Sequence, residues 1–186
     1  MEWIQYPQQR SGPDLTETII ALEETAWPSA ISTPHFPSAP DTYVTSFVLM
    51  EKEKAICHVG IRKSELLHRG VSYIAYGLSE VVTHLDYRRQ GIGTKLIKTA
   101  ADFILSARPD ISIFTCDPIR TGFYSNGGWQ VLKGGCLVGG TQQTPFRSDS
   151  LGLVTMIRFL SEKAIAHQRD FENADIFLSL GEGQLW

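Results

Sequence analysis

The chain has 186 residues, which suits one domain with a full hydrophobic core. Its net charge of −3 excludes the basic surface that a nucleic-acid-binding domain needs. Cys57, Cys116 and Cys136 form no Cys-x-x-Cys motif, so we expect no metal site and a reducing, cytoplasmic location. No apolar leader follows Met1 and no apolar run has membrane-spanning length, so we expect no membrane partner.

The first part of the chain predicts one helix between two loops. Residues 3–13 are polar and rich in turn formers. Asp14 and Glu17 form a capping pair that opens a helix ending before Pro28. Residues 28–40 contain four prolines and lack periodicity, which indicates a loop.

The central part predicts a hairpin, a long strand and a helix. Residues 42–50 and 55–62 are rich in β-branched and aromatic residues and flank a charged turn. Residues 64–70 are expected to form a loop or a short helix. Residues 71–83 are extended, with a bulge expected at Gly77. Apolar residues then recur at helical spacing through residues 91–107.

The last third alternates strands with short turns and helices. Strands are expected at 111–116, 129–132, 151–160 and 176–180. Asp117 and Pro118 supply the cap and first position of a short helix that ends near Asn126. Residues 134–140 hold four glycines and are expected to be a mobile or tight turn. This alternation predicts a mixed α/β fold with a sheet core.

The turn between the long strand and the central helix carries the main functional signal. Gly91 and Gly93 allow close backbone approach to a ligand where a helix N-terminus offers unpaired N–H donors. Arg88 and Arg89 add two positive charges. Such a turn suits a diphosphate. The alternative is a glycine-relaxed turn with surface arginines.

Two known phosphate motifs do not fit this turn. No Gly-Lys-Ser/Thr follows the glycines, and there is no third glycine at the dinucleotide-binding offset. The pattern Arg88-x-x-Gly91-x-Gly93 instead resembles the acyl-CoA pyrophosphate loop of the GCN5-related N-acetyltransferases (GNAT). About thirty residues later, Phe123-Tyr124 followed by Gly128-Trp129 resembles the second hallmark of that superfamily. The resemblance covers at least residues 71–132.

The resemblance implies a single GNAT-like domain over 1–186, of α/β (α+β) class. Its central sheet is expected to be mixed, mostly antiparallel, splayed at the acetyl-CoA site and flanked by helices. Residues 1–70 would hold the N-terminal helix, substrate loop and hairpin, 71–132 the acetyl-CoA-binding core, and 133–186 the C-terminal strands and substrate-site tail. The residues expected to bind acetyl-CoA are Val81, Val82, Thr83, Arg88, Arg89, Gln90, Gly91, Ile92, Gly93 and Thr94.

The chemistry of acetyl transfer needs a base and an acid. Neutralising a lysine-like amine at pH 7 costs about 4.6 kcal/mol, and less for an aminosugar, so a moderate base suffices. We expect Glu80, at the end of the long strand, to be that base, although the resembling family carries Glu where this chain has Ser79. Tyr124 matches the superfamily's general acid and would protonate the leaving thiolate. The alternatives are a surface carboxylate for Glu80 and a packing aromatic for Tyr124.

A narrower resemblance points to a substrate. Tyr87 to Gly93, Phe123-Tyr124, the stretch 128–134 and the closing Gly-x-Leu-Trp are similar to the aminoglycoside 2'-N-acetyltransferases, in which the terminal Trp carboxylate lies in the antibiotic site. The first loop, 27–40, lacks carboxylates, which predicts a less cationic ligand. Kasugamycin, with one free sugar amine and a carboxylate of its own, fits that prediction and would make the chain a resistance enzyme. The residues expected to contact the substrate are Trp27, Phe36, Asp41, Ser79, Thr115, Asp117, Glu182 and Trp186.

Other interpretations stay open at this level. The chain could acetylate proteins, peptides or another small amine, or could be a non-catalytic CoA-binding domain. His84, Cys116 and the Cys57-His58 pair are expected to be structural rather than catalytic. A homodimer is possible, as members of the superfamily commonly dimerise.

Overall fold

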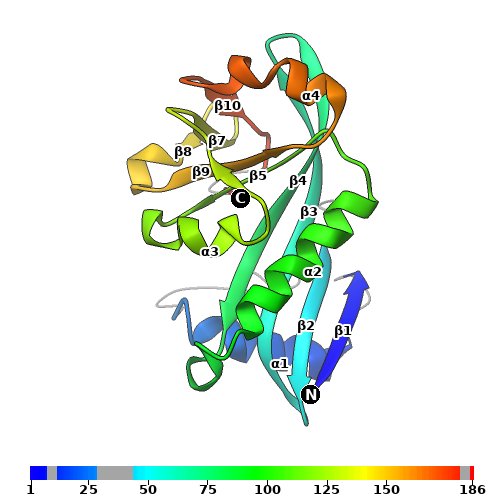
Figure 1. Cartoon of the computed structure of the whole chain (residues 1–186). Helices are drawn as coiled ribbons and strands as arrows, with labels where there is room; N and C mark the ends of the chain where they lie inside the picture. The colour runs from blue at the N-terminus through cyan, green and yellow to red at the C-terminus, as the bar shows by residue number, and fades with distance from the viewer. Residues whose placement is uncertain (8–11, 29–43, 181–184) are drawn as a thin grey trace. The chain divides into compact units, whose positions relative to one another are not determined.

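The computed structural model describes residues 1–7, 12–28, 44–180 and 185–186. Its larger sheet has the hydrogen-bonded strand order β1-β2-β3-β4-β5-β9-β6 (Figure 1). These strands are β1 Glu2–Pro7, β2 Thr45–Glu51, β3 Lys54–His68, β4 Val71–Thr83, β5 Ile111–Cys116, β9 Val154–Phe159 and β6 Gln130–Val131. Strands β4 and β5 are parallel, whereas the pairs β1–β2, β2–β3, β5–β9 and β6–β9 are antiparallel. The predicted mixed, mostly antiparallel sheet is confirmed.

The described residues also form a smaller sheet, four α-helices and the 3-10 helices Leu85–Tyr87, Pro118–Arg120, Asp149–Leu151 and Gln168–Phe171. The smaller sheet has the order β10-β7-β8, from Asp175–Phe177, Cys136–Gly140 and Pro145–Arg147. The helices are α1 Pro13–Glu24, α2 Ile92–Ser106, α3 Thr121–Ser125 and α4 Glu162–Ala166. Within the described ranges, none of these helices has the length and apolar character to cross a membrane.

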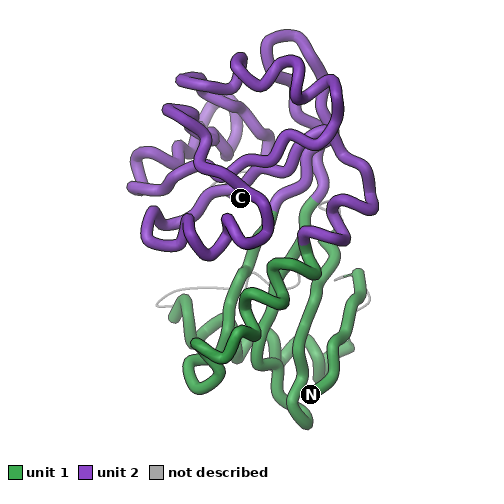
Figure 2. The backbone as a smooth tube through the Cα atoms, in the orientation of Figure 1, with its two compact units in different colours: residues 1–62, 78–100 green, residues 63–77, 101–186 purple. Residues whose placement is uncertain are grey.

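The chain forms two compact units (Figure 2). Unit 1 comprises residues 1–62 and 78–100, and unit 2 comprises residues 63–77 and 101–186. Strands β3 and β4 and helix α2 contribute residues to both.

The core of unit 1 forms where α1 packs on the sheet. Ile19 and Leu22 lie on one face of α1 and pack with Val48 of β2, Ala55 of β3 and Val82 of β4. The Ala55 amide donates to Thr18 Oγ1 of α1 over 2.9 Å, which fixes the helix on β3. Residues 55–62 of β3 are buried without interruption, as expected for a central strand covered on both faces. Any polar side chain in this run therefore needs a partner.

The core of unit 2 is aromatic. Phe114 of β5 makes edge-to-face contacts with Tyr124 and Trp129, at ring-centroid distances of 4.8 and 5.4 Å. The Trp129 Nε1 donates to Ser112 Oγ over 2.9 Å, so its buried N–H is satisfied. Tyr124 lies on α3, which is drawn as a short helix in Figure 1.

Several local predictions were wrong. Residues 2–7 form edge strand β1, not a loop, because the chain pairs with β2 from Glu2↔Met50 to Pro7↔Thr45. Residues 64–68 continue β3 as a strand. Helix α1 begins at Pro13 with Gly12 as N-cap and no side-chain cap, because proline is already favourable at the first helical position.

The glycine-rich stretch 134–140 was also misread. Its last five residues are the fully buried strand β7, which pairs with β8 and β10. The bulge expected at Gly77 stays a prediction, and Glu80 of the same strand has a left-handed backbone, with φ +54°. Strand β9 starts at Val154, since residues 149–151 form a short 3-10 turn.

Candidate functional site

The turn before α2 is held in place by its own hydrogen bonds. Arg88 Nε donates to the Thr83 carbonyl over 2.9 Å, and Gln90 Nε2 donates to the Asp86 carbonyl over 2.9 Å. The His84 side chain accepts from the Asp86 amide and caps the 3-10 turn Leu85–Tyr87. His84 is therefore a turn-forming residue, as expected.

The backbone of this turn is shaped for close approach. Gly91 has φ +77°, and a Cβ there would meet no other atom within 4 Å. Arg89 also has a left-handed backbone, with φ +62°. Residues 88–91 are exposed, and Ile92 opens α2. Exposed N–H donors at the start of a fifteen-residue helix, with two arginines beside them, fit the phosphates of a CoA-type ligand.

Glu80 lies in an unusual stretch of β4. Its left-handed backbone costs of order 1–3 kcal/mol in a non-glycine residue, and such strain clusters at functional sites. Gly60 of β3 makes room for the side chain, because a Cβ there would lie 2.9 Å from Glu80 Oε2. The neighbouring Ser79 Oγ donates to the Gly60 carbonyl over 3.3 Å.

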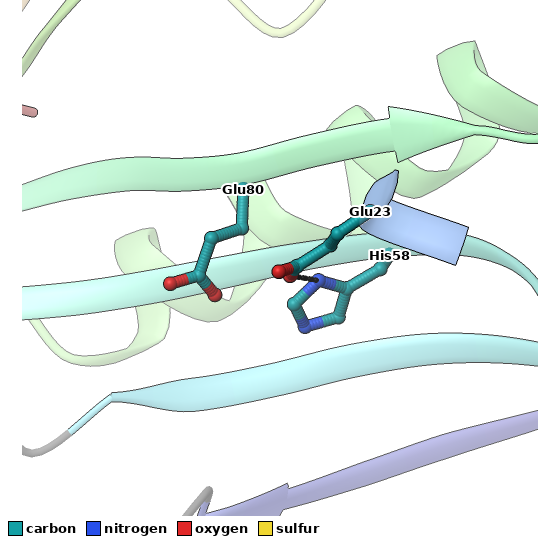
Figure 3. Close-up of side chains that lie close together, drawn as sticks. All are labelled: Glu23, His58 and Glu80. Carbon is teal, nitrogen blue, oxygen red and sulfur yellow. Dashed lines mark ion pairs between the residues drawn. The ribbon is translucent and has the colours of Figure 1, made fainter. Parts of the chain in front are cut away.

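Glu80 does not stand alone (Figure 3). Its Oε1 lies 3.5 Å from Arg62 Nη2, and both side chains are only 10% exposed. A carboxylate oxygen of Glu23, a carboxylate oxygen of Glu80 and a ring nitrogen of His58 lie within 4.8 Å of one another. The imidazole of His58 is fully buried, with Nδ1 3.3 Å from Glu23 Oε1.

The same three donors raise the question of a metal ion. One nitrogen and two carboxylates form an acceptable ligand set. The Arg62 guanidinium beside Glu80, however, already supplies positive charge to that carboxylate and opposes a dication there. The donor set therefore fits a charge-paired acid–base cluster better than a metal centre.

Tyr124 belongs to unit 2 and is 6% exposed. Burial raises the pKa of its phenol well above the ordinary value, and the nearby Cys116 adds to this effect while Arg120 opposes it. Burial likewise raises the pKa of the Cys116 thiol to about 11, with Asp117 adding to the shift. Both groups are protonated near neutral pH. Cys116 is thus a buried thiol without nucleophilic character, as expected.

Trp186 forms a second cluster within unit 2. Its main-chain oxygen accepts from the Thr115 amide over 2.7 Å and from the Thr115 hydroxyl. Strand β4 pairs with β5 at Ala75↔Ile111 and Tyr76↔Ser112. Trp186 bonds to β5 at Thr115, further along that strand. The indole lies on Gly77, where a Cβ would come within 2.6 Å of its Cδ2. This close contact with the indole leaves no room for a side chain at residue 77.

The remaining predicted substrate residues are scattered. Trp27 follows α1 and is 54% exposed, and Asp117 uses its carboxylate to cap the 3-10 turn Pro118–Arg120. Phe36, Asp41 and Glu182 lie outside the described residues. Glu80 and the α2 turn lie in unit 1, whereas Thr115, Tyr124 and Trp186 lie in unit 2, so a joint role for the two sets stays a prediction.

Sequence reasoning missed Glu23 as the buried partner of His58. Glu23 follows Ile19 by one helical turn, so it occupies a core-facing position of α1. His58 lies in the middle of an uninterrupted buried run. A charged residue at a core-facing helix position and a histidine in a doubly buried strand were the available signals, because each demands a buried partner.

Comparisons with known proteins identify the family and the fold of the chain. The family model of the acetyltransferase (GNAT) domain matches residues 15–132. No curated protein matches the chain. Escherichia coli ElaA has a similar structure, with TM-score 0.63 and 12% identity over 85% of this chain and 99% of that one.

Two further solved structures share the fold. An aminoglycoside 6'-N-acetyltransferase complexed with coenzyme A has TM-score 0.56 and 11% identity over 85% of this chain and 97% of its own. A GNAT-family acetyltransferase from Brucella melitensis, in complex with acetyl-CoA, has TM-score 0.52 and 22% identity over 69% and 83%. Because the family model covers more than half of the sequence, the chain belongs to the GNAT acetyltransferase family.

Proposed function

We propose that this protein is an acetyl-CoA-dependent N-acetyltransferase that acetylates an amino group of an aminoglycoside-type antibiotic, with kasugamycin as the leading candidate. The observation that carries the acetyl-CoA part is the exposed turn at Gly91, whose left-handed backbone has open space above it at the start of α2. Val81 to Thr83 and Arg88 to Thr94 would hold the co-substrate. Family membership and the CoA-containing relatives support the same reaction.

In this proposal Glu80 takes the proton of the acceptor ammonium. Only a neutral amine can attack a thioester, and a carboxylate in hydrogen-bond reach or one water away can supply the needed base. Tyr124 would donate a hydrogen bond to the leaving thiolate. Since burial raises its pKa, its part is stabilisation by a phenol that stays protonated, rather than full release of a proton.

The acceptor would lie against Trp27, Ser79 and Trp186, with Phe36, Asp41, Thr115, Asp117 and Glu182 as further contacts. In the described part of the chain, the buried Trp186 Nε1 has no hydrogen-bond acceptor, and in this proposal it would donate to a substrate oxygen once the substrate is bound. The absence of carboxylates in residues 27–40 favours a ligand with one amine over a polycation.

The second candidate is acetylation of a peptide, protein or other small amine. In either reaction the side chains of Glu80, Arg62 and Glu23 would serve proton transfer, so their arrangement does not favour one acceptor amine over another. A thiol-release assay with acetyl-CoA should therefore compare kasugamycin, kanamycin-type polyamines and a lysine peptide. We expect kasugamycin to react fastest. Faster acetylation of the polyamines or the peptide overturns the substrate assignment. If no amine causes release of the CoA thiol, the assignment as an acetyltransferase is overturned.

A further inference from the structure

Behind Glu80, on the face of the unit 1 sheet that packs against α1, lies a polar cluster inside an otherwise apolar core. His58 is fully buried in β3, and Glu23 of α1 is 9% exposed. Both sit next to the apolar group of Ile19, Leu22 and Val48. Burying a carboxylate or an imidazole costs free energy unless a partner compensates. The contacts of these side chains therefore show which charges the cluster can stabilise.

Each nitrogen of His58 has a defined neighbour. Nε2 lies 2.9 Å from Ser46 Oγ, a fully buried hydroxyl of β2. Nδ1 lies 3.3 Å from Glu23 Oε1. If Nε2 donates to Ser46, Nδ1 carries a lone pair in the neutral ring and becomes an N–H facing Glu23 when it is protonated. Glu23 is thus placed to stabilise the imidazolium.

Glu80 connects this pair with the predicted acceptor side. Its carboxylate lies within 4.8 Å of the donor atoms of both Glu23 and His58, and Figure 3 shows all three side chains converging. A distance of this size is bridged by one water molecule. The Arg62 guanidinium also lies near Glu80, with Nη2 3.5 Å from Oε1.

We propose that Glu23 and His58 form a proton relay behind Glu80. This inference rests on the proposed function. An N–H bond of the acceptor ammonium breaks and an O–H bond forms on Glu80. That O–H bond then breaks through the bridging water, and an N–H bond forms at His58 Nδ1, where Glu23 stabilises the positive charge. Glu80 regains its negative charge, and the imidazolium later returns its proton to solvent. No oxidant, reductant or further reactant is needed.

The surroundings of His58 define the charges involved. Around His58, α1 presents Glu23, β4 presents Glu80 and β2 presents the neutral Ser46 hydroxyl, while β3 presents Arg62 beside Glu80. Tyr6 of β1, opposite Ser46 in the strand register, adds a buried phenol oxygen. Glu23 and Glu80 therefore carry the negative charge that attracts a proton to His58. Removing the charge of Glu23 without changing its size is the most selective perturbation.

The test compares Glu23→Gln with Glu24→Gln across pH. Glu24 is the next residue of α1 and is exposed, so its variant removes the same charge outside the cluster. The readout is kcat/KM for kasugamycin, or for the aminosugar that the wild type acetylates fastest, between about pH 6.5 and 9.5. An acceptor amine titrates within or near this range and needs no base once it is neutral.

We expect Glu23→Gln to lower kcat/KM at least about tenfold at pH 6.5 and to approach the wild-type rate near pH 9.5, where the acceptor is neutral. His58→Asn should behave alike, Glu24→Gln should follow the wild type, and Glu23→Asp should recover part of the low-pH rate. All four variants should bind acetyl-CoA with the affinity of the wild type, as measured by calorimetry. This measurement also shows that the variants are folded.

Three results overturn the relay. One is an equal loss at every pH, which indicates a structural role. Another is a wild-type rate of Glu23→Gln at pH 6.5. The third is full activity only with an added divalent ion, which would make the cluster a metal site. If the wild type transfers no acetyl group to any amine while binding acetyl-CoA, the proposed function fails first and the relay fails with it.

Discussion

Glu80 and Gly60 are in such close contact that a side chain at residue 60 would displace the Glu80 carboxylate. A Cβ at residue 60 would lie 2.9 Å from Glu80 Oε2 and 2.7 Å from Ser79 Oγ. The carboxylate that we assign as the base therefore lies over the β3 backbone, and its position depends on a missing side chain in the neighbouring strand.

We predict that Gly60→Ala displaces Glu80. Overpacking of this kind costs about 1–3 kcal/mol, and kcat should fall at least about tenfold because proton removal needs correct placement. Acetyl-CoA affinity should persist. Gly122→Ala is the control, since a Cβ at Gly122 meets nothing within 4 Å. Steady-state kinetics and thermal melts separate the two effects, and an unchanged kcat in Gly60→Ala contradicts the placement.

Tyr124→Phe tests the phenol separately from its ring. The ring packs edge-to-face on Phe114 and Phe123, and phenylalanine retains these contacts. We expect kcat to fall at least about tenfold with little change in the KM for acetyl-CoA, because only the hydrogen bond to the leaving group is lost. Turnover equal to the wild type rules out a hydrogen bond from Tyr124 to the leaving thiolate.

The pH dependence of Tyr124 has a defined sign. The protonated phenol is the active form, and burial raises its pKa above the ordinary value of about 10. Loss of this proton therefore should not reduce kcat anywhere below about pH 10. A pH–rate profile with an alkaline decline near pH 9 that disappears in Tyr124→Phe contradicts this expectation.

Gly77→Ala tests whether Trp186 contributes to the acceptor site. The added methyl group would overlap the indole, so the Trp186 side chain must move. We expect the KM of the acceptor to rise by about tenfold, while acetyl-CoA binding remains. This change corresponds to about 1.4 kcal/mol of lost binding. Trp186→Ala should show the same pattern, and normal acceptor kinetics in both variants removes Trp186 from the substrate contacts.

Asp110 gives a prediction about stability rather than activity. Its carboxylate accepts from the Ile74 amide at 2.8 Å and Ser161 Oγ at 2.7 Å, and pairs with Lys163 Nζ at 2.9 Å. Burial alone raises its pKa, but these partners outweigh burial, and the net pKa is lowered. The stabilisation is therefore present above the unfolded-state pKa of Asp and is lost as pH falls through the lower folded-state value.

Asp110→Asn should lower the free energy of unfolding by about 1–3 kcal/mol at pH 7, because three donors lose a charged acceptor. The difference from the wild type should shrink in acid, where the wild-type carboxyl is protonated too. Urea unfolding at pH 7 and at about pH 3 measures both values. A difference that stays constant between these pH values contradicts the assigned role.

Sequence patterns predicted the turn before α2 and the start of that helix because their signals are local. Gly91, the two arginines and the helical period all lie within one stretch, and helix α2 began one residue after the expected position. Asp117 followed by Pro118 likewise marked a helical start that the structure confirms. Local chemistry determines such turns, so one sequence is enough to find them.

The parts that could not be predicted depend on distant partners. Strand β1 looks like a loop until β2 pairs with it, and the glycines of β7 look like a turn until β8 and β10 lie beside them. The cluster of Glu23, His58 and Glu80 joins three elements that are far apart in the chain. Only the fold reveals that a core-facing carboxylate on α1 has a buried histidine as its neighbour.

Binding of acetyl-CoA to matched glycine variants tests the central claim most directly. Gly91 and Gly152 have φ of +77° and +69°, and a Cβ at either meets nothing within 4 Å, so alanine strains both alike. Calorimetry should show that Gly152→Ala binds acetyl-CoA like the wild type, whereas Gly91→Ala binds at least about tenfold more weakly. Equal affinity of the two variants would contradict the assignment of the α2 turn as the phosphate site.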